Sequence, residues 1–159
     1  ILFDSLKDHH MENFIVIYPN NDLGSKFILN EISEIENKNR SNFHVKKSFK
    51  FEYFLSILKN SKGIIGNSSA GMHEAPAIGL PALNLGSRQT GRFQHECVSN
   101  IDFDKIQIQK WIEKHRVLKR YLSSEHYGIG NSSKLFSELL EKNFFNDVSL
   151  QKVFKDFKL

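Results

Sequence analysis

The sequence predicts an α/β protein with a Rossmann-like parallel sheet and helices on both faces. Two observations lead to this class. Short apolar runs alternate along the chain with segments of about ten residues whose apolar side chains recur at helical spacing. The chain has 159 residues, 40% of them apolar and 14 of them Phe, which is enough for one domain with its own core. Alternating strands and helices indicate right-handed βαβ units.

The first predicted strand is residues 14–18 (FIVIY), an apolar run that Pro19 ends. Turn-forming residues fill positions 19–25, and apolar side chains at helical spacing then predict a helix over 27–38. Residues 43–46 alternate and form the second predicted strand. The remaining predicted strands are 63–65, 81–85 and 98–101, and the remaining predicted helices are 51–60, 70–78, 106–118 and 135–140.

Net charge, apolar runs and cysteine content restrict the partners and the cellular location that we expect. The formal net charge of +4 comes from Lys and Arg spread along the chain, which suits an anionic ligand and argues only weakly for nucleic acid, so we expect no nucleic-acid partner. No apolar run approaches the roughly 20 residues of a membrane span, so we expect no membrane partner. The single Cys97 cannot form an internal disulfide, which favours a reducing, cytoplasmic location.

The ends of the sequence carry two further expectations. The opening ILFDSLK has no Met and resembles the end of an amphipathic helix, so we expect a C-terminal part of a longer protein; a processed or poorly ordered N-terminus is the alternative. We expect residues 1–142 to form the ligand-binding domain. Residues 143–159 either pack on that domain or dock on a missing one.

The stretch GIIGNSSAGMHEAPAIGLPALNLGSRQTGR, residues 63–92, is the most informative. Gly66 to Gly71 lies between a predicted strand and a predicted helix, where ligands of open α/β sheets bind. Small residues let a ligand approach the backbone, whose free N–H groups, with the hydroxyls of Ser68 and Ser69, can hold an anion. The alternative is that either serine merely caps the helix.

Two neighbouring features extend this candidate site. Glu74 is placed to accept hydrogen bonds from ribose hydroxyls, although spacing alone favours a solvated helix residue. The loop 86–92 follows the next strand and carries Arg88 and Arg92, either of which can neutralise a phosphate; surface arginines are the alternative. Two such loops at adjacent strand ends favour an anionic ligand between them.

Other motifs are weaker. The Walker pattern GxxxxGK[ST] is absent, which disfavours a P-loop nucleoside triphosphatase (NTPase), and Gly128-Ile129-Gly130 lacks the strand and third glycine of a dinucleotide site. The seven histidines show no metal-ligand spacing, so we expect no metal and no cofactor. Cys97 has no base that can be placed beside it, and a small packed side chain is expected there rather than a nucleophile.

Residues 64–92 resemble the C-terminal domain of the hydrolysing UDP-N-acetylglucosamine 2-epimerases, which make N-acetylmannosamine for sialic acid synthesis. PNNDLGS at 19–25 and YGIGN at 127–131 extend the resemblance to roughly residues 10–142. It implies half of a glycosyltransferase-B-like enzyme of two Rossmann-type domains, commonly a homo-oligomer, with a UDP-sugar in the cleft between the domains.

The resemblance also implies roles for particular residues. The diphosphate would lie on the loop holding Ser68, Ser69 and Gly71, and Glu74 would bind the ribose. The remaining implied substrate-binding residues are Ser48 and Phe49 at the uracil, Asn20 at the substrate and Arg88 near the phosphates. Lys50 stands where other members carry Pro, which affects the expected detail of the uracil pocket.

The implied reaction starts with loss of UDP, gives a 2-acetamidoglucal-like intermediate, and ends with addition of water and inversion at C2. The carboxylates for proton transfer belong to the family's N-terminal domain, so the catalytic residues are unknown here and the chain alone is expected not to turn over. Two other functions stay open: the nucleotide-binding domain of a UDP-sugar glycosyltransferase, and a free-standing regulatory nucleotide-binding module. The non-hydrolysing epimerases fit less well, because their Asp-Ser-Gly-Gly type loop is absent.

Overall fold

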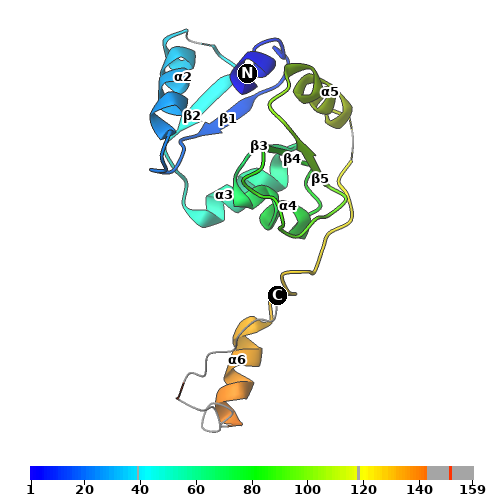
Figure 1. Cartoon of the computed structure of the whole chain (residues 1–159). Coiled ribbons are helices and arrows are strands. Elements are labelled where there is room, and N and C mark those ends of the chain that lie inside the picture. Colours follow the sequence, from blue (N-terminus) through cyan, green and yellow to red (C-terminus); the bar gives the residue numbers. More distant parts are fainter. Residues whose placement is uncertain (39, 118, 143–150, 152–159) are drawn as a thin grey trace, which may run out of the picture. The chain divides into compact units, whose positions relative to one another are not determined.

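The computed structural model describes residues 1–38, 40–117, 119–142 and 151, and these form two compact units (Figure 1). The first unit is Ile1–Ser124 and holds all five strands; the second is Glu125–Leu159 and holds helix α6 (Ser132–Glu141). The predicted domain boundary at residues 142 and 143 stays a prediction. The two alternatives for residues 143–159 fall, apart from Gln151, outside the described residues.

The strands of the first unit are all parallel, which confirms the predicted α/β class. β1 (Phe14–Ile17) pairs with β2 (Phe43–Lys46). β4 (Ala82–Leu85) pairs with β3 (Ile64–Gly66) on one side and with β5 (Val98–Ile101) on the other. The five strands therefore form a two-stranded and a three-stranded sheet, and within the described residues β1 and β3 are not hydrogen-bonded neighbours.

Helices lie between and beside these strands (Figure 1). α1 packs against α5, and α2 packs against β2. The helices of the first unit are α1 (Leu2–Leu6), α2 (Ser25–Asn37), α3 (Phe51–Asn60), the 3-10 turn η1 (Ser69–Gly71), α4 (Glu74–Ala77) and α5 (Lys105–His115). The part of the chain that the structure describes contains no helix long and apolar enough to cross a membrane.

The continuous helix predicted over residues 70–78 was wrong. The chain instead makes the single 3-10 turn η1 and then begins α4 at Glu74. Pro76 explains the break, because proline is tolerated in the first turn of a helix but removes a hydrogen bond from its interior. A helix that contains Pro76 must therefore begin about where α4 does, and the loop before it keeps a separate conformation.

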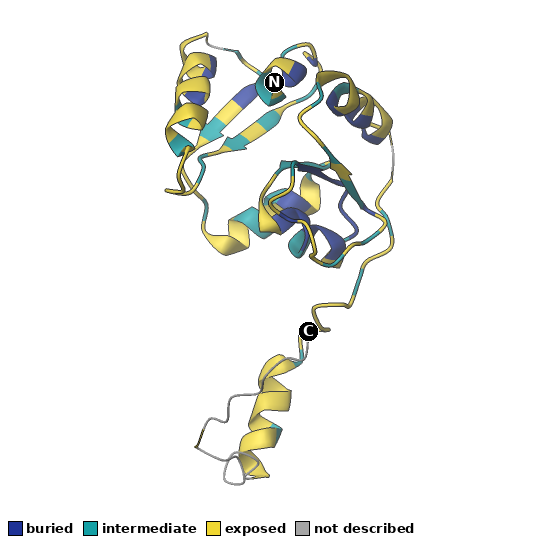
Figure 2. Cartoon of the chain, viewed as in Figure 1, coloured by how far each residue is buried: buried dark blue, intermediate teal, exposed yellow. Residues whose placement is uncertain are grey.

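The core is organised around β4, whose four residues are all buried (Figure 2). Leu83 and Leu85 belong to the larger apolar cluster, which α5 supplies with Ile108 and Ile112. Ala82 points to the opposite face and joins a smaller cluster under α3 and α4. Side chains alternate along a strand, so Asn84 shares the face of Ala82, at the carboxyl end of the strand.

An extended segment after α5 is hydrogen-bonded to the ends of α3 and α4. The N–H of Tyr121 donates to the carbonyl of Gly79 at 2.9 Å, and the N–H of Ser124 donates to the carbonyl of Pro76 at 2.9 Å. Arg120 donates to the carbonyls of Leu58, Lys59 and Ser61 at the end of α3. The hydrogen bonds from Tyr121 and Ser124 thereby hold the loop between α4 and β4 in place.

Gly79 is predicted to be indispensable for this contact. Its φ is +63°, and a Cβ built on it would lie 2.0 Å from the carbonyl oxygen of Tyr121. We expect Gly79→Ala to lower the free energy of unfolding by more than about 2 kcal/mol, because left-handed strain and the clash act together. Gly24→Ala is the matched control, since Gly24 has φ +91° and no atom within 4 Å of such a Cβ. Equal losses in urea unfolding of the two variants would contradict this reading.

Buried His115 predicts a pH dependence of stability. Its Nδ1–H donates to the Trp111 carbonyl at 2.7 Å, so its Nε2 accepts from the Tyr121 hydroxyl at 3.3 Å. Burial, chiefly, lowers the pKa of His115 in the folded chain. The unfolded chain then binds more protons below about pH 6.5, so the free energy of unfolding should fall as the pH falls through that value. His115→Gln should flatten this slope in urea unfolding and His10→Gln should not; equal slopes would contradict the assignment.

Candidate functional site

One cavity of about 1010 Å³ lies at the carboxyl ends of the strands in the first unit. Loops that follow β1, β2, β3 and β4 line it, which is where open α/β sheets bind ligands. Its volume suits a nucleotide-sized ligand. All eight predicted substrate-binding residues are in its lining: Asn20, Ser48, Phe49, Ser68, Ser69, Gly71, Glu74 and Arg88. The structure therefore brings together what the sequence placed on four separate loops, while the roles of these residues stay predictions.

The cavity continues between the two sheets, where β1 and β3 are unpaired. Ile65, Leu83 and Trp111 are among the apolar residues that line this part. The mouth is polar and the interior is apolar, as is usual for small-molecule sites. Asn20 and Ser48, in loops that follow the strands of the two-stranded sheet, line the same space as Ser68, which follows a strand of the three-stranded sheet.

The loop 66–71, hereafter the phosphate loop, lies flat on β4. Gly71 is buried, and a Cβ built on it would be 3.7 Å from the Cβ of Ala82. Ser68 accepts a hydrogen bond from the N–H of Ala70 at 3.3 Å, so the capping role considered for a serine is present at Ser68. The Ser68 hydroxyl still has its own proton to donate, and the side chains of Asn67, Ser68 and Ser69 are exposed.

Glu74 begins α4 and lines the cavity. Its Oε2 is buried and has no hydrogen-bond partner among the described residues. Glu74 is therefore not the solvated helix residue that its spacing alone favoured. A buried carboxylate oxygen without a donor is costly, and a hydroxyl group of a ligand would supply that donor.

The loop 86–92, hereafter the arginine loop, closes one side of the cavity. Arg88 donates to Asp22 at 3.0 Å, so the arginine loop is joined to the loop after β1. Both side chains are more than half exposed, and such a pair contributes little to stability. Arg88 can therefore exchange this partner for a ligand phosphate at small cost. Arg92 lies 3.3 Å from Nε2 of His73, which precedes α4.

Sequence reasoning missed two buried amides. Gln89 is 2% exposed and donates from Nε2 to the carbonyl of Asn67 at 2.7 Å. Asn84 is 3% exposed and donates to Oδ1 of Asn100 at 2.8 Å. Both line the cavity, and each keeps a buried oxygen without a partner among the described residues. An Asn inside an apolar strand is a readable signal, whereas a Gln beside arginines in a polar loop resembles a surface residue.

Lys50, which stands where the resemblance expects Pro, precedes α3 with φ −61° and ψ 146°. Proline has the same φ, so the backbone keeps the direction that proline would impose. Ser48 and Phe49 consequently enter the cavity lining without a rearrangement at Lys50.

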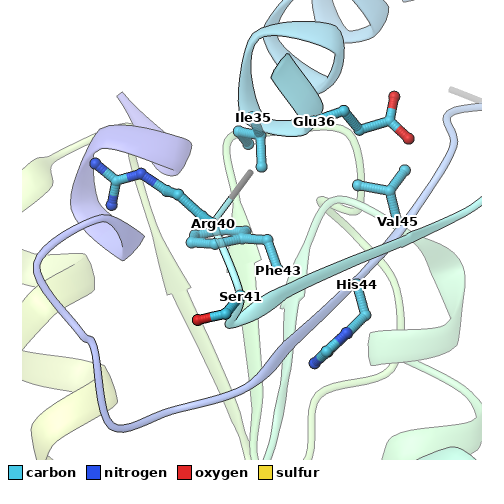
Figure 3. A pocket seen from close by; sticks show the side chains of 7 residues that line it. All are labelled: Ile35, Glu36, Arg40, Ser41, Phe43, His44 and Val45. Carbon is cyan, nitrogen blue, oxygen red and sulfur yellow. The ribbon is translucent and has the colours of Figure 1, made fainter. Parts of the chain in front are cut away.

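A second hollow of about 440 Å³ lies at the end of α2 and the start of β2 (Figure 3). Glu36, Arg40 and His44 are its charged and titratable lining residues. It is an open surface depression at the amino end of a parallel strand, opposite to the edge where such sheets bind ligands. Arg40 is moreover engaged, because it donates to the carbonyl of Lys7 at 3.0 Å. We therefore assign the functional site to the larger cavity.

Across residues 1–38, 40–117, 119–142 and 151, no three His, Cys, Asp or Glu side chains are grouped so as to hold a metal ion. Cys97 is 1% exposed, as expected for a packed side chain, and burial raises the pKa of its thiol to about 11.

Comparison with known proteins agrees with this geometry. A family model described as UDP-N-acetylglucosamine 2-epimerase matches residues 2–141. The chain belongs to the UDP-N-acetylglucosamine 2-epimerase family. The match runs from α1 to the last residue of α6, so it includes every loop that lines the cavity.

Several curated relatives are similar over most of the chain. It is 34% identical over 151 residues to the UDP-N-acetylglucosamine 2-epimerase of Neisseria meningitidis, which covers 93% of this chain and 39% of that protein. It is 28% identical to the polysialic acid biosynthesis protein P7 of Escherichia coli, over 91% of this chain and 37% of the relative. A hydrolysing UDP-N,N'-diacetylbacillosamine 2-epimerase of Legionella pneumophila is 29% identical over 80% of this chain and 33% of its own length. The chain thus spans less than two fifths of these relatives.

Cys97 is predicted to be chemically inert in the folded chain. The thiolate is the reactive form, and a pKa of about 11 leaves almost none of it at pH 8. Alkylation by iodoacetamide at pH 8, followed by mass spectrometry, should label the native chain far more slowly than the urea-unfolded chain. Equal labelling rates in the two states would contradict the packed assignment.

Proposed function

We propose that this chain is the UDP-binding half of a hydrolysing UDP-N-acetylglucosamine 2-epimerase, which converts UDP-N-acetylglucosamine to N-acetylmannosamine and UDP for sialic acid or capsule synthesis. The observation that supports it most is the gathering of four loops around one cavity in a chain of this family. Similarity to an E. coli polysialic acid biosynthesis protein supports the proposed pathway.

The chemistry of the lining is complementary to a nucleoside diphosphate. Ser68 and Ser69 offer hydroxyl and backbone donors to phosphate oxygens. Arg88 offers a guanidinium, the side chain best suited to phosphate. Glu74 offers its unpartnered carboxylate oxygen to the ribose hydroxyls. Of the other lining residues, Ser48 and Phe49 would contact the uracil, and Asn20 would contact the sugar side of the substrate.

This domain's share of catalysis is stabilisation of the leaving group. Cleavage of the sugar–phosphate bond leaves negative charge on UDP, and donors already aimed at the phosphates lower the cost of that charge. Proton transfer at C2 requires carboxylates that we place in the family's other domain. The isolated chain therefore binds UDP without turning over the sugar nucleotide, and the full-length protein works as a cytoplasmic homo-oligomer.

A second candidate function differs from the first in the substituents of the sugar. The relative from L. pneumophila is named for UDP-N,N'-diacetylbacillosamine, so a diacetylated sugar is an alternative substrate of the same reaction. The family match favours both epimerase readings over a UDP-sugar glycosyltransferase or a regulatory module.

The proposal predicts a ligand preference for the chain. Calorimetric titration should give a Kd for UDP at least about tenfold below that for uridine, because the diphosphate adds charge-assisted hydrogen bonds. Glu74→Gln should weaken UDP binding about tenfold and weaken binding of 2′-deoxy-UDP much less, whereas Glu113→Gln, an exposed site on α5, should change neither.

Two results would refute this proposal. Equal affinity for UDP and uridine would show that the phosphate loop is only a structural turn. Multiple turnovers of UDP-N-acetylglucosamine by the isolated chain would show that it is not half of an active site.

A further inference from the structure

Gln89 links the arginine loop to the phosphate loop. It lies between Arg88 and Thr90, yet its side chain turns inward and is 2% exposed. Its Nε2 donates to the carbonyl oxygen of Asn67 at 2.7 Å. This is a short, partly buried hydrogen bond between two loops that both line the cavity.

The orientation of the Gln89 amide follows from its partner. A backbone carbonyl can only accept, so the NH₂ end of the side chain must face Asn67. The other end, Oε1, is then left buried, and it has no partner among the described residues. Leaving a buried acceptor unpaired costs free energy, and the hydrogen bond to Asn67 does not remove that cost. Among the described residues, the hydrogen bond to the Asn67 carbonyl is the one polar contact of this side chain.

The hydrogen bond also fixes the direction of a peptide N–H. In a planar trans peptide the C=O and the N–H point in opposite directions. The carbonyl of Asn67 points inward to Gln89, so the N–H of Ser68 points outward from it. Within the described residues no acceptor faces this N–H, and Ser68 itself is exposed. Ser68 lines the cavity, and this N–H, without an acceptor among the described residues, is open to an external one.

Rotation of this one peptide would reverse the polarity of the loop. It would bring the Asn67 carbonyl to the place of the Ser68 N–H, where a partial negative charge repels a phosphate oxygen. Such a rotation changes ψ of Asn67 and φ of Ser68, which is −72° in this structure. Gln89 is the side chain that opposes it.

Gln89 is itself held in place. The N–H of Arg92 donates to the Gln89 carbonyl at 3.3 Å, and the N–H of Thr90 donates to the Ser87 carbonyl at 3.0 Å. These two hydrogen bonds hold the backbone of the arginine loop in a turn around Gln89.

A chain of side-chain amides connects the arginine loop to β4. Gln94 donates to the Arg92 carbonyl at 3.3 Å, Asn100 donates to Gln94 at 2.7 Å, and Asn84 donates to Asn100 at 2.8 Å. These hydrogen bonds position the arginine loop, and with it Gln89, relative to the buried strand β4.

We propose that Gln89 is a positioning residue, which locks the Asn67–Ser68 peptide so that its N–H faces the diphosphate. This inference rests on the proposed binding of UDP. Gln89 touches no ligand atom in this role; it acts through the backbone of the phosphate loop. Its effect should therefore appear in the phosphate-dependent part of binding and be absent from nucleoside binding.

Gln89→Met tests the proposal, since methionine has a similar length and no N–H donor. By calorimetry on the chain, the Kd for UDP should rise about tenfold while the Kd for uridine changes less than about twofold. Gln107→Met, at an exposed position on α5, is the matched control and should change neither Kd.

Gln89→Glu supplies a second, independent readout. An ionised carboxylate would repel the Asn67 carbonyl, whereas a protonated carboxyl group can donate to it as the amide does. Relative to the unsubstituted chain at each pH, UDP binding by Gln89→Glu should be weak at pH 7.5 and recover as the pH falls toward 5. A side chain that only filled space would show no such recovery.

The outcomes separate this inference from the proposed function. If the unsubstituted chain binds UDP no better than uridine, the proposed function fails and Gln89 has no diphosphate to serve. If it prefers UDP and Gln89→Met keeps the same preference, only the positioning role is overturned. Equal loss of UDP and uridine binding in both variants, or unfolding of both at every pH, would also overturn it by making Gln89 purely structural.

Discussion

Burial of β4 on both faces is the constraint on which the rest of the site depends. One face carries Leu83 and Leu85 into the core shared with α5. The other carries Ala82, on which the phosphate loop rests through Gly71. A Cβ built on Gly71 would lie 3.7 Å from the Cβ of Ala82, so the phosphate loop packs directly on the strand. The phosphate loop after β3 and the arginine loop after β4 lie at the same edge, because the two strands are parallel. Asn84, near the end of β4, donates to Asn100 in the chain of amides that reaches the arginine loop.

The polar groups around the cavity divide into donors and acceptors in a way that suits one ligand class. Donors gather at the phosphate and arginine loops, where Ser68, Ser69 and Arg88 face the cavity. The Oε2 of Glu74 is a buried acceptor without a partner in the described part of the chain. A nucleoside diphosphate presents anionic oxygens and vicinal hydroxyls to these two kinds of group. The exposed pair between Arg88 and Asp22 holds the arginine near this place, and in the function that we propose a ligand phosphate would replace the aspartate.

Periodicity and turn chemistry were sufficient for the fold class, because apolar runs and helical spacing report directly which faces are buried. They failed at residues 70–78, where Pro76 decided the start of α4 against the apolar pattern. They also gave no sign that β1 and β3 would be unpaired, since strand pairing depends on contacts between distant residues.

The part of the candidate site that lies at the ends of strands could be predicted from the sequence. Each predicted residue comes within a few positions of a strand or of the turn after it, and the sheet places such residues together. Gln89 escaped notice because its importance lies in the carbonyl that it binds, which no local pattern records. Asn84 could have been noticed as a polar residue inside an apolar strand, but its hydrogen bond to Asn100 could not. The resemblance to the epimerases supplied the ligand, and the family match supports it independently of the geometry.

A crystal structure of the chain soaked with UDP would test the central claim most directly. We predict the two phosphoryl groups on the Ser68 and Ser69 side of the cavity, with the N–H of Ser68 donating to a phosphate oxygen and Glu74 at the ribose. Nucleotide density in the hollow beside α2, or an Asn67 carbonyl turned toward the phosphates, would contradict the account.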